Sequence, residues 1–324
     1  MRICMLTTTH RPRDGRIFEK EAKSLAKEHD VTVIAPSDAG DTGEEGVRII
    51  TVPKPASPLL HGVTLWRVLR ACRGEECDVI HCHEPDALLL ARFVDAKIAV
   101  SESVAGRFRG GRAEPVIISN YSVAGLAPPD PGVRERYGVV YMAGNMQMFH
   151  GVRECIQAIS RVRVKFPYVS LTLIGGIRAD IGAIMAKTNP RPEITMTGYL
   201  PYREMYEALR AGSVGLLVFQ PAYHNAYIGL PNKLFDYMLC GLPVVASDFP
   251  EIRKVVTDAG CGILVDPTSP DAIAEAVIYL MEHPEEAQRM GESGQRAVLE
   301  RYNWGRMEER LLDLYQSLND SGMA

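Results

Sequence analysis

Residues 227–247, YIGLPNKLFDYMLCGLPVVAS, combine a helix start with two charged side chains. Pro231 suits the first turn of a helix and Gly241 suits its end, so a short helix is predicted between them. The start of such a helix presents free backbone amides beside Lys233, and together they could bind an anion. Asp236 follows, and its carboxylate could accept hydrogen bonds from sugar hydroxyls. A plain capped helix with a surface aspartate explains the same residues equally well.

A second group of side chains consists of residue types that commonly bind metal ions. It consists of Cys77, His81, Cys82, His83 and Glu84. Because His81 and Cys82 are consecutive in a predicted strand, they point to opposite faces, and we predict no metal site. His83 comes where this strand ends, at the edge of the sheet where ligands bind in parallel α/β folds.

Familiar phosphate-binding signatures are missing from the sequence. It contains neither G-x-x-x-x-G-K-[ST] nor G-x-G-x-x-G, which argues against a P-loop and against a dinucleotide fingerprint. No two aspartates lie two residues apart, so a divalent-metal clamp for a sugar diphosphate is not expected. Any phosphate would be held by backbone amides, helix dipoles and side chains, without a metal or other cofactor.

Short apolar segments rich in β-branched residues alternate with helical patterns, which predicts parallel sheets covered on both faces. The first helical pattern has Phe18, Ala22, Leu25 and Ala26 on one face. Residues 122–136 are rich in proline and glycine and are typical of a linker. We therefore predict two doubly wound α/β domains facing across a cleft. The predicted strands span residues 2–6, 31–35, 47–52, 78–82, 97–100 and 115–119, then 139–143, 170–175, 193–197, 214–218, 242–246 and 261–265.

The composition is that of an ordinary globular protein of about two domains. The chain has 324 residues, of which 46% are hydrophobic and 23% charged, and its net charge is −4. This balance disfavours nucleic acid as a partner. The seven cysteines include no C-x-x-C, which indicates buried thiols in a reducing compartment. The N-terminus lacks a signal-peptide pattern, and no apolar run is long enough to cross a membrane, so a cytoplasmic location is expected.

Residues 59–73 could lie on the inner face of a membrane. Their apolar residues alternate with Arg67, Arg70 and Arg73, which recur every three or four positions. Basic amphipathic helices of this kind can bind anionic lipid. The alternative is a helix packed on the sheet with its arginines in solvent.

Residues 227–247 resemble the donor-site signature of the family-four retaining glycosyltransferases, which have the GT-B fold. Other segments are similar to this family in the same order: HRPRDGRIFEKE (10–21), DVIHCHEPD (78–86), LIGG (173–176), GYL (198–200) and YNW (302–304). The resemblance implies an acceptor-side domain of residues 1–122 plus a C-terminal helix, 305–324. Residues 123–304 would form the domain that binds the nucleotide-sugar.

The same resemblance implies roles for individual residues. Asp236 would bind the ribose of the donor, and Gly198 and Tyr199 would lie by its base. Arg16 would face the cleft as a phosphate contact, and His83, Asp14 and His10 are the candidate catalytic residues. Further donor-site candidates are Asn145, His150, Gly175, Gly229, Leu230, Pro231 and Lys233.

The sequence departs from the family pattern at several positions. Ile228 replaces an acidic residue, and Asp236 replaces a glutamate. Asn145 and His150 occupy positions that usually carry cations, and a histidine is only partly charged at pH 7. A block of several dozen residues, including a strand that ends in a catalytic histidine, is not found between residues 88 and 98.

Three functions are consistent with this sequence. The leading hypothesis is a retaining, metal-independent glycosyltransferase that moves a sugar from a nucleotide-diphospho-sugar to a glycan, lipid-linked or small-molecule acceptor. The alternative is a weak or inactive sugar-nucleotide-binding protein in a polysaccharide-assembly system. A sugar-nucleotide epimerase would need acid and base groups, for which His10, His81, His83 and His150 are the candidates.

Overall fold

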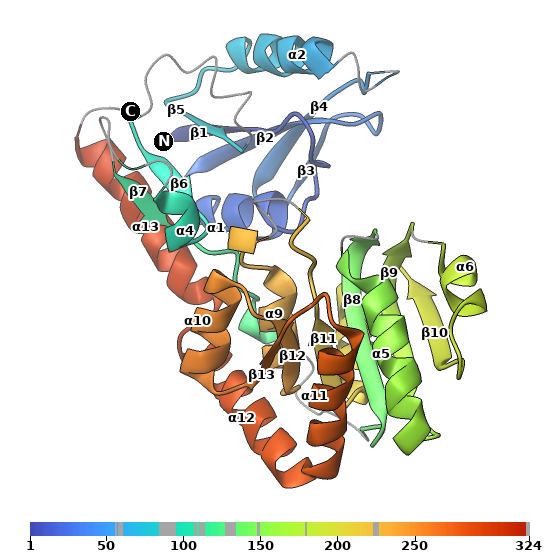
Figure 1. Ribbon diagram of the computed structural model, residues 1–324. Coiled ribbons are helices and arrows are strands. Elements are labelled where there is room, and N and C mark those ends of the chain that lie inside the picture. The colour runs from blue at the N-terminus through green and yellow to red at the C-terminus, as the bar shows by residue number, and fades with distance from the viewer. Residues whose placement is uncertain are drawn as a thin grey trace. The chain divides into compact units, whose positions relative to one another are not determined.

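The structure is a computed structural model that describes residues 1–55, 57, 61–83, 95–106, 109, 114–126, 134–147, 150–178, 180–222 and 227–321. The chain forms two compact units (Figure 1). Unit 1 consists of Met1–Val100, Ala105–Asn120 and Gly305–Ala324, and unit 2 consists of Ser101–Val104 and Tyr121–Trp304. The facing of two domains across a cleft stays a prediction.

Unit 1 contains a five-stranded sheet in the order β3-β4-β2-β1-β5. Its strands are β1 (Arg2–Leu6), β2 (Asp30–Pro36), β3 (Thr42–Glu44), β4 (Val47–Val52) and β5 (Val79–Cys82). All pairs are parallel except β3 with β4. Strands β1 and β2 are buried along nearly their whole length because helices cover both faces, α2 (His61–Arg73) on one and α1 (Lys23–Leu25) on the other (Figure 1).

The first helical segment differs from a regular α-helix. It begins as a π-helical turn, η1 (Ile17–Ala22), and continues as α1. The Asp14 carbonyl accepts from both Phe18 and Glu19, and its side chain accepts from the amides of Arg16 and Ile17. These bonds widen the first turn, and π-type turns of this kind are frequent at functional sites. Phe18, Ala22 and Leu25 of the predicted stripe are fully buried.

Two further parts complete unit 1. Strands β6 (Lys97–Ala99) and β7 (Pro115–Ile117) form a separate parallel pair. Helix α4 (Glu102–Ala105), which follows β6 in the sequence, lies mostly within the segment Ser101–Val104 that belongs to unit 2. The last helix, α13 (Trp304–Asp320), buries Met307, Leu311 and Tyr315. The Ser119 amide donates to Met307 Sδ at 3.2 Å, which fixes this distant segment beside β7.

Unit 2 is built on a six-stranded parallel sheet in the order β10-β9-β8-β11-β12-β13. In order of sequence within the unit this is 3-2-1-4-5-6, the Rossmann arrangement. The strands are β8 (Gly138–Met146), β9 (Ser170–Ile177), β10 (Glu193–Gly198), β11 (Val214–Leu217), β12 (Val244–Ser247) and β13 (Gly262–Val265). The helices are α5 (Val152–Lys165), α6 (Ile181–Ala186), α7 (Tyr202–Ala211), α9 (Asn232–Leu239), α10 (Pro250–Ala259), α11 (Pro270–Glu282) and α12 (Pro284–Glu300), with η3 (Ala124–Leu126) ahead of the sheet.

Both faces of this sheet carry an apolar layer. Val139 and Tyr141 of β8 pack in one layer with residues of α5 and α11, whereas Val140 and Met142 pack in the other with residues of α9 and α10. Alternate residues of a strand point to opposite faces, so a strand buried on both sides is apolar at every position. This explains the continuous apolar runs in the sequence.

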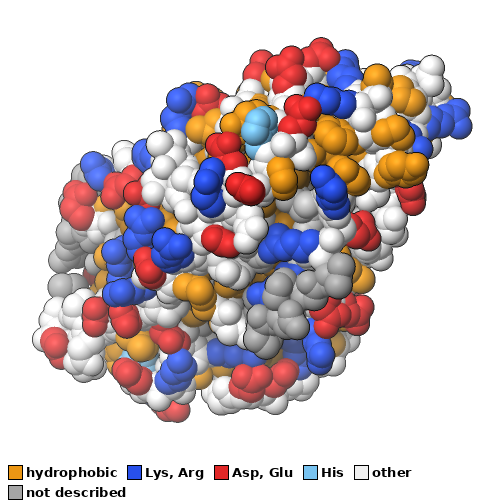
Figure 2. Space-filling model, turned by 90° about the horizontal axis from the view of Figure 1, so that it is seen from below, with side chains coloured by type: hydrophobic (Ala, Val, Ile, Leu, Met, Phe, Trp, Pro, Cys, Tyr) orange, Lys and Arg blue, Asp and Glu red, His pale blue; other side chains and the backbone are white. Residues whose placement is uncertain are grey.

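The charge distribution on the surface and the length and polarity of the helices relate to the predictions about nucleic acid and membrane. On the face shown in Figure 2, lysine and arginine side chains are interspersed with aspartate and glutamate. Among the described residues, no helix is both long and apolar enough to cross a bilayer. Helix α2 packs on the sheet of unit 1 through Thr64, Val68 and Cys72, and it leaves Trp66 54% exposed. Residues 59 and 60 of the predicted membrane segment lie outside the described residues.

Candidate functional site

The carboxyl edge of the unit 2 sheet has its switch point between β8 and β11, where α/β folds bind ligands. Helix α5 begins there at Gly151, whose φ is +80°. A Cβ atom at this position would overlap the Val218 carbonyl oxygen, so a glycine is required. The first amides of α5, which have no intrahelical acceptor, therefore start at the ligand-binding edge.

Lys233 lies in the first turn of α9, after Pro231 in extended conformation. Its Nζ is 4.5 Å from the centroid of the Phe219 ring, which follows β11. Burial lowers the pKa of the Lys233 ammonium to about 7, and the attraction of Asp236 only partly opposes this. Within the described part of the chain, this ammonium has no carboxylate in salt-bridge contact. A bound anion would supply the missing counter-charge.

Asp236 lies one turn further along α9 and is engaged within unit 2. Its Oδ1 accepts from Ser122 Oγ at 2.6 Å and from Tyr206 Oη at 2.8 Å. Burial, together with the Asp236 charge, raises the pKa of Tyr206 above its usual range, so this phenol remains a donor. No sequence pattern marked Ser122 or Tyr206 as partners of Asp236, because both come from other segments of the chain. The ribose contact of Asp236 stays a prediction.

His150 lies in the turn between β8 and α5. Its Nδ1 is 3.0 Å from the Gln147 amide nitrogen, which must donate, so Nδ1 is an acceptor and the ring proton lies on Nε2. The ring also packs edge-on against Phe219 at 5.2 Å. Of Asn145, only the backbone, within β8, is described.

The glycines and Tyr199 at the ends of β9 and β10 are explained by close packing. Gly175 has φ +119°, and a Cβ there would overlap the Ala143 carbonyl oxygen of β8. The Tyr199 ring, 71% exposed, lies against Gly176, where an added Cβ would be 2.6 Å from the ring. Gly198 has φ +69° and turns the chain into Tyr199. Gly229 and Leu230 are half-buried ahead of α9.

Of the predicted catalytic residues, His83 belongs to a buried polar cluster around Glu21 in unit 1. Glu21 Oε2 is 3.5 Å from His83 Nδ1 and 3.8 Å from His81 Nε2, and its Oε1 is 3.8 Å from Arg16 Nε. His81 Nδ1 lies 2.8 Å from the Tyr315 hydroxyl of α13. Glu21 Oε2 and His83 Nε2 are buried without a hydrogen-bond partner in the described chain.

Burial sets the charge of this cluster. It raises the pKa of Glu21 to about 7 against the opposing pull of Arg16, and it lowers the pKa of His81 to about 4. The pKa of His83 is also lowered well below its usual value by burial and by neighbouring cations. At neutral pH both imidazoles are therefore neutral.

Asp14 and His10 lie beside this cluster and form a pair at 3.1 Å. Burial opposes ionisation of Asp14, but hydrogen bonds from His10 and from the amides of Arg16 and Ile17 together lower its pKa to about 2. Asp14 thus holds the start of η1 as an ionised carboxylate. Sequence reasoning singled out His10, Asp14, Arg16 and His83 but assigned no role to Glu21.

Among the residues that the structure describes, two sets of three side chains have ligand atoms close enough to hold a metal ion. One is Glu21, His81 and His83, since residues two apart on a strand share a face, which the argument from His81 and Cys82 overlooked. A cation there would lie near the Arg16 guanidinium, which disfavours it. The predicted absence of a metal stays a prediction.

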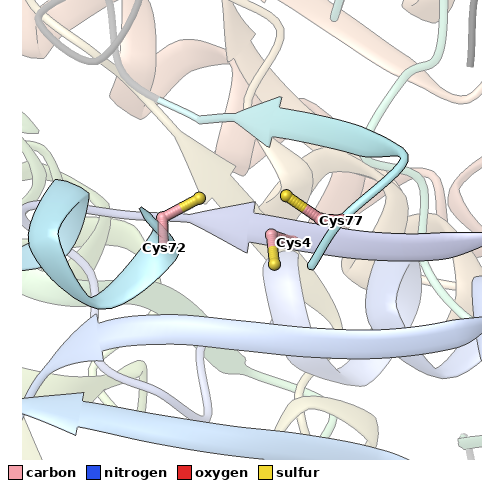
Figure 3. Close-up of side chains that lie close together, drawn as sticks. All are labelled: Cys4, Cys72 and Cys77. Atoms are coloured by element: carbon pink, nitrogen blue, oxygen red, sulfur yellow. The ribbon is translucent and has the colours of Figure 1, made fainter. Parts of the chain in front are cut away.

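The other set joins Cys4 of β1, Cys72 of α2 and Cys77 ahead of β5 (Figure 3). It lies in the apolar layer between α2 and the sheet. Contact with Cys72, together with burial, raises the pKa of the Cys4 thiol above its usual range. Protonated and buried, Cys4 acts as a small apolar core residue.

Unit 2 has a sheet in Rossmann order with Lys233 near its carboxyl edge, and unit 1 of the same chain has a largely parallel sheet, an arrangement that fits the GT-B class. Residues 127–297 match the family described as "Glycosyl transferases group 1", and residues 15–100 match "Glycosyltransferase Family 4". The first match covers more than half of the chain, and the chain belongs to the group 1 glycosyl transferases.

Curated relatives are more distant. The chain is 25% identical over 193 residues to an alpha-D-kanosaminyltransferase of Streptomyces kanamyceticus, over 57% of this chain and 48% of that protein. It is 27% identical over 209 residues to a D-inositol 3-phosphate glycosyltransferase of Xylanimonas cellulosilytica, over 59% and 48%. The chain thus spans about half the length of the curated relatives it matches. These relatives are named as enzymes and give no support to the inactive alternative.

Solved structures share the fold over nearly the whole chain. Anabaena HepE, solved in complex with UDP and glucose, has a TM-score of 0.77 at 16% identity, covering 98% of this chain and 100% of that one. Sucrose-phosphate synthase from Thermosynechococcus elongatus has a TM-score of 0.75 at 16% identity, covering 99% of both. These likenesses show the GT-B fold.

Proposed function

We propose that this chain is a retaining, metal-independent glycosyltransferase that takes a sugar from a nucleotide-diphospho-sugar. The acceptor would be a glycan, a lipid-linked sugar or a small molecule. The observation that supports this best is Lys233, a buried amine in the first turn of α9 that has no carboxylate at salt-bridge distance as its counter-charge within the described chain. A diphosphate at the carboxyl edge of the sheet would provide it.

The donor would bind along that edge of unit 2. Its diphosphate would lie between Lys233 and the first amides of α5, and Asp236 would accept from the ribose hydroxyls. The exposed Tyr199 ring, held against Gly176, offers an aromatic face to the base. The structure of HepE was solved in complex with UDP. A nucleoside diphosphate is therefore a suitable probe for the donor site proposed here.

The chemistry asks mainly for positioning and charge stabilisation. In the proposed step, the bond from the anomeric carbon to the diphosphate breaks, and the leaving phosphate oxygen takes the proton of the attacking hydroxyl. The new glycosidic bond forms on the same face. Lys233 and the α5 amides would stabilise the departing charge, while His10, Asp14 and His83 would line the acceptor side.

Calorimetric titration with UDP, GDP and ADP tests the donor site. Asp236→Ala should weaken binding of the best nucleotide by about 1.5–3 kcal/mol, the worth of a hydrogen bond to a charged group. Lys233→Met should weaken it similarly, whereas Lys254→Met should not, because the Lys254 side chain on α10 is 59% exposed. Binding should survive a chelator. Unchanged affinity in both Asp236→Ala and Lys233→Met would remove this assignment.

Transfer itself is tested by product analysis with the best-binding nucleotide-sugar. His83→Ala should lower the transfer rate while leaving donor affinity within about 0.5 kcal/mol, because only interactions made in the transition state raise the rate. The sequence predicts that the acceptor-side domain lacks a block of residues between positions 88 and 98. Most of residues 88–98 lie outside the described part of the chain, so this stays a prediction. Turnover equal to wild type in His83→Ala would rule out its catalytic role.

Membrane contact is proposed through the outer side of α2. Trp66 is exposed there, and the Arg70 guanidinium lies 5.4 Å from its ring. An aromatic ring beside a cation suits the headgroup region of anionic lipid. We expect co-sedimentation with vesicles that contain phosphatidylglycerol, and loss of it in a Trp66→Ala, Arg70→Ala variant. Equal binding to neutral vesicles would contradict the proposal.

A further inference from the structure

Unit 2 has a cavity with charged lining residues at the amino ends of its strands, and so at the opposite edge from the predicted donor site. Its volume is about 570 Å³. Arg134 and Arg136, ahead of β8, and Arg210, near the end of α7, line it. No sequence motif pointed to this cavity, because Arg134 and Arg136 lie within the predicted linker and Arg210 belongs to a distant segment.

Arg210 is buried without adequate partners. Arg210 is 5% exposed, and its Nε and Nη1 atoms have no hydrogen-bond partner in the described chain. The polar group that it contacts is the Cys240 thiol, a weak acceptor. Arg134 differs, since its Nη1 donates to the Gly241 carbonyl at 3.0 Å and its Nη2 to the Cys240 carbonyl at 2.6 Å. A buried guanidinium without an anion loses its hydration and gains little in return.

The cavity carries an excess of positive charge. Among its described lining residues the acidic one is Glu292, which is exposed and accepts from Gln288. Burial and the charge of Arg210 both lower the pKa of Arg134, although Cys240 opposes them. The guanidinium groups are therefore near enough to repel one another. Planar guanidinium forks match the oxygens of phosphate groups.

We propose that this cavity binds a phosphate-type oxyanion, free or as a phosphomonoester, with Arg210 as the central contact and Arg134 and Arg136 beside it. The site is separate from the donor site and does not depend on the proposed function. Helix α9 connects the two, because its first turn carries Lys233 and the cavity is lined by Cys240 and Gly241 at its end.

Thermal unfolding and calorimetry of the full chain test the proposal, with inorganic phosphate against sodium chloride at constant ionic strength. Phosphate should raise the Tm of wild type, and Arg210→Met should abolish this gain at the cavity. Arg203→Met is the matched control, since Arg203 lies on the same helix with its side chain 86% exposed. Lys233→Met removes the cation of the proposed donor site, so any part of the Tm gain that this variant loses comes from phosphate bound there and not in the cavity. Glycerol 3-phosphate as a second arm distinguishes an ester from the free ion.

In buffer without phosphate, Arg210→Met should be at least as stable as wild type, because it removes an unpaired buried charge. Arg136→Gln, an exposed residue that should not disturb folding, should weaken phosphate binding about tenfold, as expected for one charge-assisted contact. Three outcomes would overturn the proposal: a phosphate response retained in Arg210→Met, a response lost only in Lys233→Met, or no effect of Arg136→Gln.

Discussion

Lys233 gives the proposed donor site a dependence on pH. With its pKa lowered to about 7, the amine is mostly neutral at pH 8 in the free protein. A bound diphosphate favours the charged form, so nucleoside diphosphate binding should take up a proton at pH 8, and affinity should fall as pH rises above about 7. Calorimetry of UDP binding in two buffers of different ionisation enthalpy measures this uptake. Lys233→Arg should bind without it, because a guanidinium stays charged. Proton uptake in that variant equal to wild type would assign the effect elsewhere.

Glu21 should destabilise unit 1 at high pH. Its folded pKa, about 7, lies above the ordinary 4.5, so its stability contribution is full below pH 4.5 and is lost as pH rises through 7. Glu21→Gln should therefore raise the free energy of unfolding by about 3 kcal/mol at pH 8 and by nothing at pH 4. Denaturant unfolding at both pH values measures this. Glu19→Gln, on the same segment but paired with Lys23 at the surface, is the control. An equal gain at pH 4 and pH 8 would show that ionisation is not the cause.

Residue types and spacing could mark His83, Lys233 and Asp236 as candidate site residues, but they could not predict the partners of these side chains. Glu21 contacts His81 and His83, which lie about sixty residues further along the sequence. Asp236 likewise contacts two residues of other segments, Ser122 and Tyr206. Such contacts depend on how strands and helices stack. Burial, which decides the charge of each group, also follows from stacking. A pattern in one sequence therefore marks candidates, and only the fold shows which are neutral.

At the scale of elements, the junction of β8 and β9 depends on two adjacent glycines with different tolerance. Gly175→Ala should cost at least about 2 kcal/mol of unfolding free energy, because its φ of +119° and the Ala143 carbonyl both exclude a side chain. Gly176→Ala should cost about 0.5 kcal/mol or less, since the exposed Tyr199 ring can move aside. Chemical denaturation of the two variants makes the comparison. Equal losses would show that the ring, like the carbonyl, cannot yield.

Apolar periodicity could predict most strands of both sheets, since a strand covered on both faces is apolar throughout. It could not predict β3, whose residues are all exposed, or its antiparallel pairing. Apolar periodicity also could not predict the π-helical turn η1, because the widened turn follows from the hydrogen bonds that Asp14 accepts. Similarly, β6 and β7 read as ordinary strands, but they pair with each other apart from the larger sheet.

At the scale of the whole molecule, unit 2 is a single stretch apart from four residues, whereas unit 1 needs the distant helix α13. A fragment of residues 121–304 should unfold cooperatively on its own. A fragment of residues 1–120 should not, because it lacks the buried Met307, Leu311 and Tyr315. Adding a peptide of residues 305–321 should restore cooperative unfolding, which circular dichroism can follow. Cooperative unfolding of residues 1–120 alone would mean that α13 is dispensable.

The return of α13 to unit 1 also sets an order of events during translation. Ribosomes add about 5–20 residues per second, so the first 120 residues wait about 10–40 s before the last helix is made. Unit 2 can close in that interval, while the apolar surface that receives Met307 and Leu311 stays uncovered. The nascent chain therefore presents this surface to chaperones until α13 has been made, and unit 1, although it is begun first, is completed only after unit 2.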